Sequence, residues 1–187
     1  MNIGVKEVRR HMKTISVIVP CYNEEKALPF FLQEVRSVLE RMMEDEELAY
    51  ELLFINDGST DGTLQLLRDA ERQDNHVQYL SFSRNFGKEA AMYAGLQHCK
   101  GDYAAVMDAD MQDPPSLLPE MYAALRSGEY DSVATRRVSR DGEPPVRSFF
   151  ARRFYRLMNR ISDTRIEDGA RDFRLMTRQM VDAILSM

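Results

Sequence analysis

The chain has 187 residues, of which 44% are hydrophobic and 29% charged, and its formal net charge is −5. This composition is typical of a globular domain that is long enough for a sizeable core. The sequence has no run of 18 apolar residues and no apolar segment near its start, so we expect neither a transmembrane helix nor a signal peptide within it. Its two cysteines, Cys21 and Cys99, fit no metal or disulfide pattern, as expected for reduced thiols of a cytosolic protein.

Up to residue 135 the sequence alternates short apolar runs with helical patterns. The apolar runs predict five strands, at residues 14–20, 50–56, 77–82, 102–107 and 131–135. Apolar residues that recur every three or four positions predict helices at residues 28–43, 60–72, 88–98 and 116–125. We expect Thr60 or Asp61 to cap the second of these helices. Strands alternating with helices predict an α/β fold with a mainly parallel sheet.

The pattern changes after residue 135. Residues 136–147 are polar and rich in turn residues, which predicts a mobile loop. Residues 148–161 place Phe, Leu, Met and Ile on one helical face and arginines on the other, which predicts an amphipathic helix. The rest of the chain is predicted to form a loop at 163–169, an extended segment at 172–176 and a helix at 178–187. This last helix has no cap before Met187, so we expect the chain to be part of a longer protein.

Charge is distributed unevenly along the chain. Residues 136–160 hold eight arginines and two acidic residues, a net charge of +6, whereas the remaining residues together carry −11. A concentrated arginine segment in an acidic protein favours an anionic partner. A solvated helix face beside a loop is the alternative interpretation.

The first four predicted strands each end in a polar motif, and these motifs are Pro20–Glu25, Asn56–Gly62, Ser83–Lys88 and Asp108–Asp110. Turn formation or helix capping explains any one of them. Ligands of parallel sheets bind beyond the carboxyl ends of the strands, so four such motifs favour a ligand site there. Asp108 and Asp110 can share a hard divalent cation, since Mg²⁺ takes one or two carboxylates and completes its shell with phosphates and water. Neither dinucleotide-binding nor P-loop glycine motifs occur in the sequence.

These motifs carry a resemblance to a known family. The segments Val17–Glu25, Asn56–Gly62, Ser83–Lys88, Asp108–Pro115 and Asp172–Met176 resemble those of the family 2 glycosyltransferases, and most of all the polyprenyl-phosphate subgroup of dolichyl-phosphate mannose synthases and bactoprenol glucosyltransferases. The resemblance implies an α/β, Rossmann-like three-layer fold, called GT-A, with a mainly parallel central sheet and a C-terminal amphipathic helix. It also implies an N-terminal extension at 1–13, a nucleotide-sugar-binding core at 14–135 and an acceptor-side segment at 136–187.

The resemblance assigns donor-side roles. The implied nucleotide-binding residues are Pro20, Tyr22, Asn23, Glu24, Asp57, Gly58, Lys88, Asp108 and Ala109, with Arg84 as a further candidate. The implied ligands of Mg²⁺ or Mn²⁺ are Asp108, Asp110 and Gln112. Such a cation offsets the charge that builds on the departing nucleotide diphosphate.

The resemblance also assigns acceptor-side roles. Asp172 and Asp110 are the implied catalytic carboxylates, and the acceptor-phosphate candidates are Arg136, Arg137 and Arg174, with Arg147 and Arg152 behind them. Arginine suits this role because its planar fork binds phosphate bidentately. The helix at 148–161 would lie on an anionic membrane surface, although it could instead pack its apolar face on the domain core.

The leading hypothesis is an inverting, metal-dependent hexosyltransferase. It would move a hexose from a nucleotide sugar, UDP-glucose before other UDP-hexoses and GDP-mannose, to a polyprenyl phosphate at the cytoplasmic face of the cell membrane. We expect a C-terminal region outside this chain to anchor the whole protein, expect no nucleic-acid partner, and leave a homo-oligomer open. The alternatives are a family 2 enzyme acting on a saccharide or cell-wall polymer, a non-catalytic nucleotide-binding domain, and a different α/β enzyme such as a nucleotidyltransferase.

Overall fold

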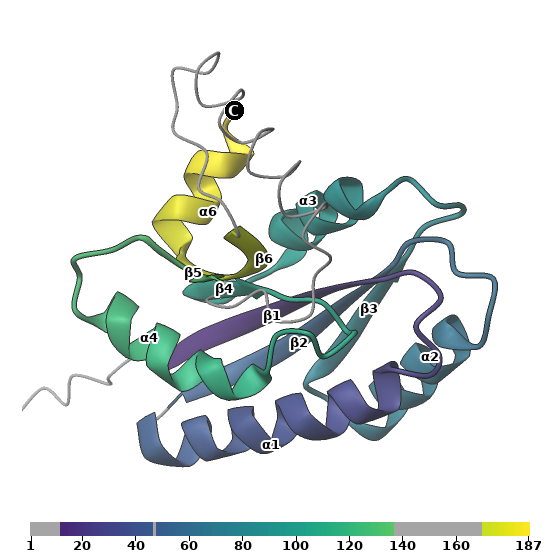
Figure 1. The fold of residues 1–187 in the computed structure, drawn as a ribbon, viewed down its shortest axis with the longest axis horizontal. Helices are drawn as coiled ribbons and strands as arrows, with labels where there is room; N and C mark the ends of the chain where they lie inside the picture. The colour runs from purple at the N-terminus through teal and green to yellow at the C-terminus, as the bar shows by residue number, and fades with distance from the viewer. Residues whose placement is uncertain (1–11, 47, 137–169) are drawn as a thin grey trace, which may run out of the picture.

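The computed structural model describes residues 12–46, 48–136 and 170–187 (Figure 1). Its strands are β1 (Lys13–Cys21), β2 (Leu48–Asn56), β3 (Val77–Ser81), β4 (Tyr103–Val106), β5 (Ser132–Arg136) and β6 (Ala170–Thr177). Its helices are α1 (Leu28–Glu46), α2 (Thr63–Gln73), α3 (Lys88–His98), the short 3₁₀ helix η1 (Pro115–Leu117), α4 (Leu118–Arg126) and α6 (Arg178–Leu185). The predicted amphipathic helix at 148–161, the predicted loop at 163–169 and all but the first residue of the predicted loop at 136–147 lie outside the described residues. That first residue, Arg136, belongs to β5 instead.

The strands form one sheet in the order β3-β2-β1-β4-β6-β5. The pairs β1–β2, β2–β3 and β1–β4 are parallel, whereas β6 runs antiparallel to both of its neighbours. The prediction of an α/β fold with a mainly parallel sheet is therefore confirmed. The segment predicted only as extended at 172–176 is a strand inserted between β4 and β5, with Val106 opposite Arg174. The division of the chain into a core and an acceptor-side segment stays a prediction.

Helices cover both faces of the sheet, which gives three layers (Figure 1). On one face α1, α2 and α4 pack over a core that includes Phe31, Phe54 and Phe173. On the other face α3 and α6 pack over a smaller core that includes Ile18 and Val106. Successive residues along β1 and along β4 thus contribute to different cores. Both faces of a parallel sheet are buried, which is why these strands are continuous apolar runs in the sequence.

The start of α2 and the end of α6 differ from the predicted helix boundaries. Helix α2 begins at Thr63 with Gly62, rather than Thr60 or Asp61, as its N-cap, although the Asp61 side chain accepts a hydrogen bond from the Thr63 N–H at 3.0 Å. The side chains of Asn23 and Glu25 accept the backbone N–H groups of Thr60 and Gly62, which hold these residues in a loop. Helix α6 ends at Leu185, so the expectation of a helix continuing to residue 187 is wrong.

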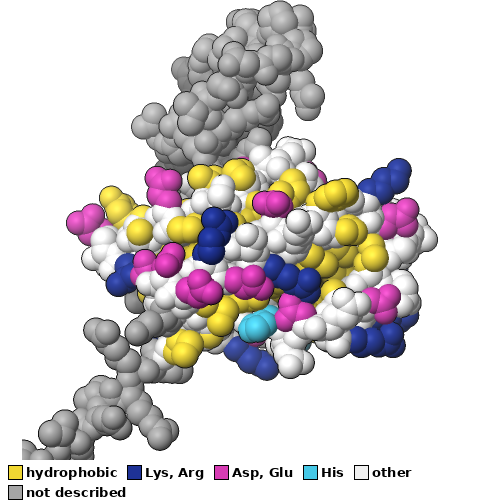
Figure 2. Space-filling model, turned by 90° about the horizontal axis from the view of Figure 1, so that it is seen from below, with side chains coloured by type: hydrophobic (Ala, Val, Ile, Leu, Met, Phe, Trp, Pro, Cys, Tyr) yellow, Lys and Arg dark blue, Asp and Glu magenta, His cyan; other side chains and the backbone are white. Residues whose placement is uncertain are grey.

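The surface formed by the described residues is mixed in charge. Figure 2 shows the molecule from below, the side on which α1 lies in Figure 1, and there acidic and basic side chains are interspersed with apolar ones. Among the described helices, none combines the length and the apolar character needed to cross a lipid bilayer.

Candidate active site

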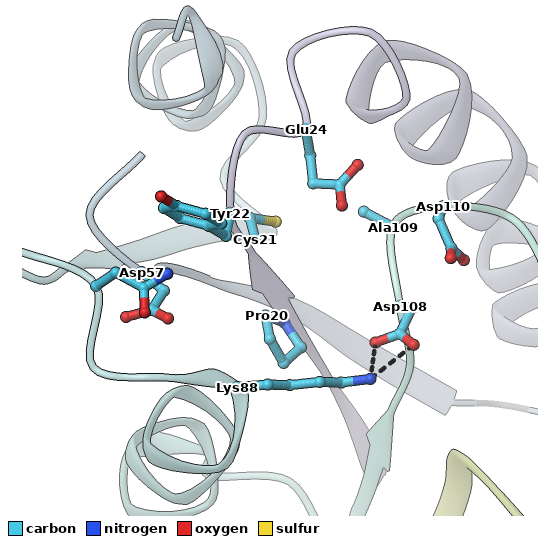
Figure 3. A pocket seen from close by; sticks show the side chains of 10 residues that line it. Pro20, Cys21, Tyr22, Glu24, Asp57, Lys88, Asp108, Ala109 and Asp110 are labelled. Carbon is cyan, nitrogen blue, oxygen red and sulfur yellow. Dashed lines mark hydrogen bonds and ion pairs between the residues drawn. The ribbon is translucent and has the colours of Figure 1, made fainter. Parts of the chain in front are cut away.

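A pocket of about 270 Å³ opens at the carboxyl edge of the sheet (Figure 3). Residues from the ends of β1, β2 and β4 and from the start of α3 line it, namely Pro20, Cys21, Tyr22, Glu24, Asp57, Asn85, Lys88, Asp108, Ala109 and Asp110. Most of these are sequence-predicted nucleotide or metal residues, brought together from four separate motifs. Cys21 and Asn85 were not predicted as site residues, although both lie inside the motifs that carried the resemblance.

Asn23 joins the loops that follow β1 and β2. It adopts a positive φ of 57°, a conformation that asparagine tolerates better than most residues. Its side-chain oxygen accepts the Thr60 N–H at 2.8 Å, and its own N–H donates to the Ser59 hydroxyl at 3.0 Å. Next along the chain, the N–H of Glu24 donates to the Thr63 hydroxyl at 2.8 Å. The described pocket lining does not include Asn23, which lies where it fixes the loop that carries Tyr22 and Glu24.

Asp57 fixes the loop that precedes α3. This carboxylate is almost fully buried, and its two oxygens accept the backbone N–H groups of Phe86 at 2.7 Å and Gly87 at 3.0 Å. The neighbouring Gly58 has a φ of 65°, and a Cβ at this position would come within 2.6 Å of the backbone of Arg84 and Asn85. Two backbones are therefore in direct contact here, which sets the position where α3 begins.

Lys88, the first residue of α3, bridges the two sides of the site. Its Nζ atom lies 2.7 Å from the Asp108 carboxylate and 2.6 Å from Oδ2 of Asp172. Burial acts to lower the pKa of Lys88, but the hydrogen bonds to both carboxylates outweigh it, so the pKa is raised and the side chain stays charged. Asp172 reaches this point because β6 runs antiparallel to β4, which places residue 172 beyond the Val106–Arg174 pair, level with the residues that follow β4.

The opposite side of the pocket is acidic. Glu24 faces Asp108 and Asp110, and its pKa is raised, first by burial and then by the charges of Asp110, Asp108 and Asp61 (Figure 3). Crowded carboxylates of this kind are the oxygen donors that Mg²⁺ and Mn²⁺ prefer, so the residue types fit a divalent cation.

The predicted metal ligands are not yet arranged around a common point. Lys88 engages Asp108, while Gln112 is exposed and uses its N–H to bind Oδ1 of Asp110 at 3.1 Å. Within the described residues no three His, Cys, Asp or Glu side chains are grouped closely enough to hold a metal. A cation at this place would compete with Lys88 for the Asp108 carboxylate.

The acceptor-side candidates are only partly described. Arg174 lies on β6 two residues after Asp172 and lines a second cavity, of about 200 Å³, between α3 and α6. Arg136 ends β5, where its backbone pairs with that of Ala170. Arg137, Arg147 and Arg152 lie outside the described residues.

Comparison with known proteins identifies the family. The family model "Glycosyl transferase family 2" matches residues 16–185. The bactoprenol glucosyl transferase of Shigella phage SfV is 40% identical over 170 residues, which cover 91% of this chain and 54% of that protein.

Two solved structures have the same fold. The mannosyltransferase PcManGT from Pyrobaculum calidifontis, solved with GDP-Man and Mn²⁺, aligns over 94% of this chain and 47% of its own, with a TM-score of 0.64 and 19% identity. Glucosyl-3-phosphoglycerate synthase from Mycobacterium tuberculosis, solved with Mn²⁺, UDP-glucose and phosphoglyceric acid, aligns over 90% of this chain and 57% of its own, with a TM-score of 0.59 and 20% identity. These likenesses confirm the expected GT-A fold.

The chain spans about half the length of the curated relatives it matches. The family match itself extends over most of the chain, and it covers every strand end that lines the pocket. The chain therefore belongs to glycosyl transferase family 2.

Proposed function

We propose that this chain forms the catalytic part of an inverting glycosyltransferase that moves a hexose from a nucleotide sugar to a polyprenyl phosphate. The observation that carries the proposal is the Lys88 bridge, because it brings Asp172 from the acceptor side within one side chain of Asp108 on the donor side. The 40% identity to a bactoprenol glucosyl transferase supports glucose as the sugar and a polyprenyl phosphate as the acceptor.

On the donor side, we propose that Tyr22 packs against the nucleobase at the exposed rim of the pocket, while Pro20 and Glu24 line the space for the nucleoside. Asp108 and Asp110 would hold Mg²⁺ or Mn²⁺, with Gln112 as the third predicted ligand. When bound, the cation supplies charge compensation for the departing diphosphate. Lys88, once released from Asp108, would add a positive charge beside the same phosphates.

On the acceptor side, an oxygen of the polyprenyl phosphate attacks the anomeric carbon of the hexose. A new carbon–oxygen bond forms as the bond to the nucleotide diphosphate breaks, so the configuration at that carbon inverts. The second pKa of a phosphate monoester is about 6, so this nucleophile is already largely anionic and needs little deprotonation. Asp172 then serves to orient the acceptor rather than to remove a proton, and Arg174 would bind its phosphate.

The lipid acceptor implies that the protein acts at a membrane surface, and we propose the cytoplasmic face, where nucleotide sugars are available. The arginine-rich segment 136–160 supports contact with anionic headgroups through its charge of +6. This part of the proposal rests on the sequence, since most of the segment lies outside the described residues.

The test is a transfer assay with a panel of donors. Purified protein with undecaprenyl phosphate in detergent is given UDP-glucose, UDP-galactose or GDP-mannose, with Mg²⁺ or Mn²⁺, and glycolipid is quantified. We expect glucosyl lipid, metal dependence, and a loss of about 100-fold in Asp172→Asn. Asp45→Asn, which changes an exposed acid near the end of α1, is the matched control and keeps full activity. Transfer only to a soluble saccharide would favour a saccharide-acting family 2 enzyme, and UDP binding without any transfer would favour a non-catalytic domain.

A further inference from the structure

The second cavity lies on the other side of Asp172 from the nucleotide pocket. It has a volume of about 200 Å³ and lies between α3 and α6, above β4 and β6, and we call it the α3–α6 cavity. Its apolar lining consists of Met92, Leu96, Val106, Met176 and Ile184. Its polar lining consists of Asp172 and Arg174.

The polar and apolar parts of this lining are separated along β6. Alternate residues of a strand share a face, so Asp172, Arg174 and Met176 follow one another along the cavity, while Phe173 and Leu175 pack in the core on the opposite face. Asp172 stands at the end where Lys88 and Asp108 lie. Met176, opposite Ala104 of β4, lies at the deeper end, which is apolar. The lining of the cavity is thus charged next to the nucleotide pocket and apolar at the opposite end.

Arg174 supplies a positive charge in the middle of this path. Its side chain is half-buried, and among the described residues it forms no hydrogen bond or ion pair. A guanidinium suits an anion at this place, because its planar fork matches a phosphate better than any other side chain does. Lys88 provides a second cation on the far side of Asp172.

We propose that the α3–α6 cavity receives the first isoprene unit of the polyprenyl phosphate, with the phosphate held by Arg174 at the end of the cavity next to Asp172. This inference rests on the proposed function and adds where the lipid tail leaves the reacting centre. At roughly 30 Å³ for each water-sized group, the five carbons of one isoprene unit need roughly 150 Å³, which the cavity offers. Met92 and Met176 suit such a ligand because unbranched thioether side chains adapt to an irregular, methyl-branched chain.

Binding of short lipid phosphates tests the proposal without catalysis. Farnesyl phosphate and methyl phosphate are titrated into the protein by calorimetry, in the presence and absence of UDP. Each buried methylene strengthens binding about fourfold, so we expect farnesyl phosphate to bind at least about tenfold more tightly. With ¹³C-methyl methionine labelling, the signals of Met92 and Met176 shift with farnesyl phosphate and not with methyl phosphate.

Filling the cavity should remove the contribution of the tail alone. Met92→Trp fills it from α3, and Ile184→Phe fills it from α6 in case the first variant is too destabilised to study. In either variant we expect farnesyl phosphate to bind no more tightly than methyl phosphate, while UDP binding is unchanged. Met43→Trp is the matched control, because Met43 is also half-buried on a helix but packs on the opposite face of the sheet.

Three results would overturn the proposal. They are equal affinities for the two phosphates, a tail-dependent gain that survives both cavity-filling variants, and methionine signals that do not move, as when another segment of the chain already fills the cavity. Failure here is distinct from failure of the proposed function. Glucosyl transfer to undecaprenyl phosphate that proceeds in Met92→Trp with an unchanged KM for the lipid removes the cavity role and leaves the function standing. Absence of transfer in the unsubstituted protein removes the function instead.

Discussion

Replacing Lys88 by methionine should change metal binding and catalysis in opposite directions. In the structure the Lys88 ammonium occupies the place between Asp108 and Asp172 where a divalent cation would reach the Asp108 carboxylate, with contacts of 2.7 and 2.6 Å. A cation that binds Asp108 therefore competes with Lys88 for this carboxylate. Methionine keeps the length and the apolar stem of the side chain and removes only the competing charge.

The size of the effect follows from exposure. The side chains of Lys88 and Asp108 are each 36% exposed and that of Asp172 is 49% exposed, so solvent screens both pairs. Ion pairs this accessible contribute about 0.2–1 kcal/mol each. Removing the Lys88 charge should therefore strengthen metal binding by up to about 1 kcal/mol, which is a factor of about five in affinity. Glucosyl transfer should fall by about 100-fold, because a positive charge beside the departing diphosphate is lost.

Titration of Mn²⁺ followed by electron paramagnetic resonance, without nucleotide, measures the first quantity, and the transfer assay measures the second. Lys26→Met is the matched control, since it removes an equal charge from the exposed loop after β1. Its Mn²⁺ affinity should rise less than that of Lys88→Met. An unchanged or weaker Mn²⁺ affinity in Lys88→Met would refute the idea that the ammonium and the metal compete for Asp108.

Three further substitutions test how the site is built. Because the pKa of Glu24 is raised, the folded state binds more protons than the unfolded state as pH rises above the ordinary value of 4.5, and stability falls through that window. Glu24→Gln should therefore raise Tm at pH 7 and leave it unchanged near about pH 3.5. Equal shifts in Tm at the two pH values would contradict this. The Cβ of Gly58→Ala would meet backbone atoms within 2.6 Å, whereas Gly128→Ala has a similar positive φ but open space around it. In urea unfolding, the free energy of unfolding should fall by about 1–2 kcal/mol for Gly128→Ala and by at least about 2 kcal/mol more for Gly58→Ala. Asp57→Asn leaves the N–H of either Phe86 or Gly87 without an acceptor, at a cost of about 1–3 kcal/mol. Hydrogen exchange of at least one of these two amides should quicken, while exchange of the Asp74 amide, whose N–H donates to the Ala70 carbonyl in α2, should not.

Local patterns in the sequence were enough to predict most elements of the core. Helix α3 spans residues 88–98 in both the prediction and the structure, and the predicted strands lie within a few residues of the observed ones. This succeeds because an element that buries one face repeats its apolar residues with a short period, and that period is visible in neighbouring residues. The parallel arrangement then placed the predicted motifs at one sheet edge, and the pocket lies there.

The boundaries of α2 could not be predicted in this way. Asn23 and Glu25 hold residues 60–62 out of the helix through hydrogen bonds that span more than 35 residues of sequence. A local pattern contains no information about such a partner. The sequence also could not show that Asp57, a predicted nucleotide-binding residue that lines the pocket, accepts the backbone N–H groups of Phe86 and Gly87 in the loop before α3.

By itself, then, the sequence determined the alternating α/β architecture, the family, and the set of polar residues gathered at the carboxyl edge of the sheet. Only the tertiary structure decided how these residues meet. Strand β6 inserts antiparallel beside β4, and this non-local pairing carries Asp172 to Lys88 across 84 positions of sequence. The same pairing also forms the α3–α6 cavity next to the Asp172 carboxylate. Strand order and register depend on which apolar faces pack together over the whole chain, so they become visible only when the fold is complete.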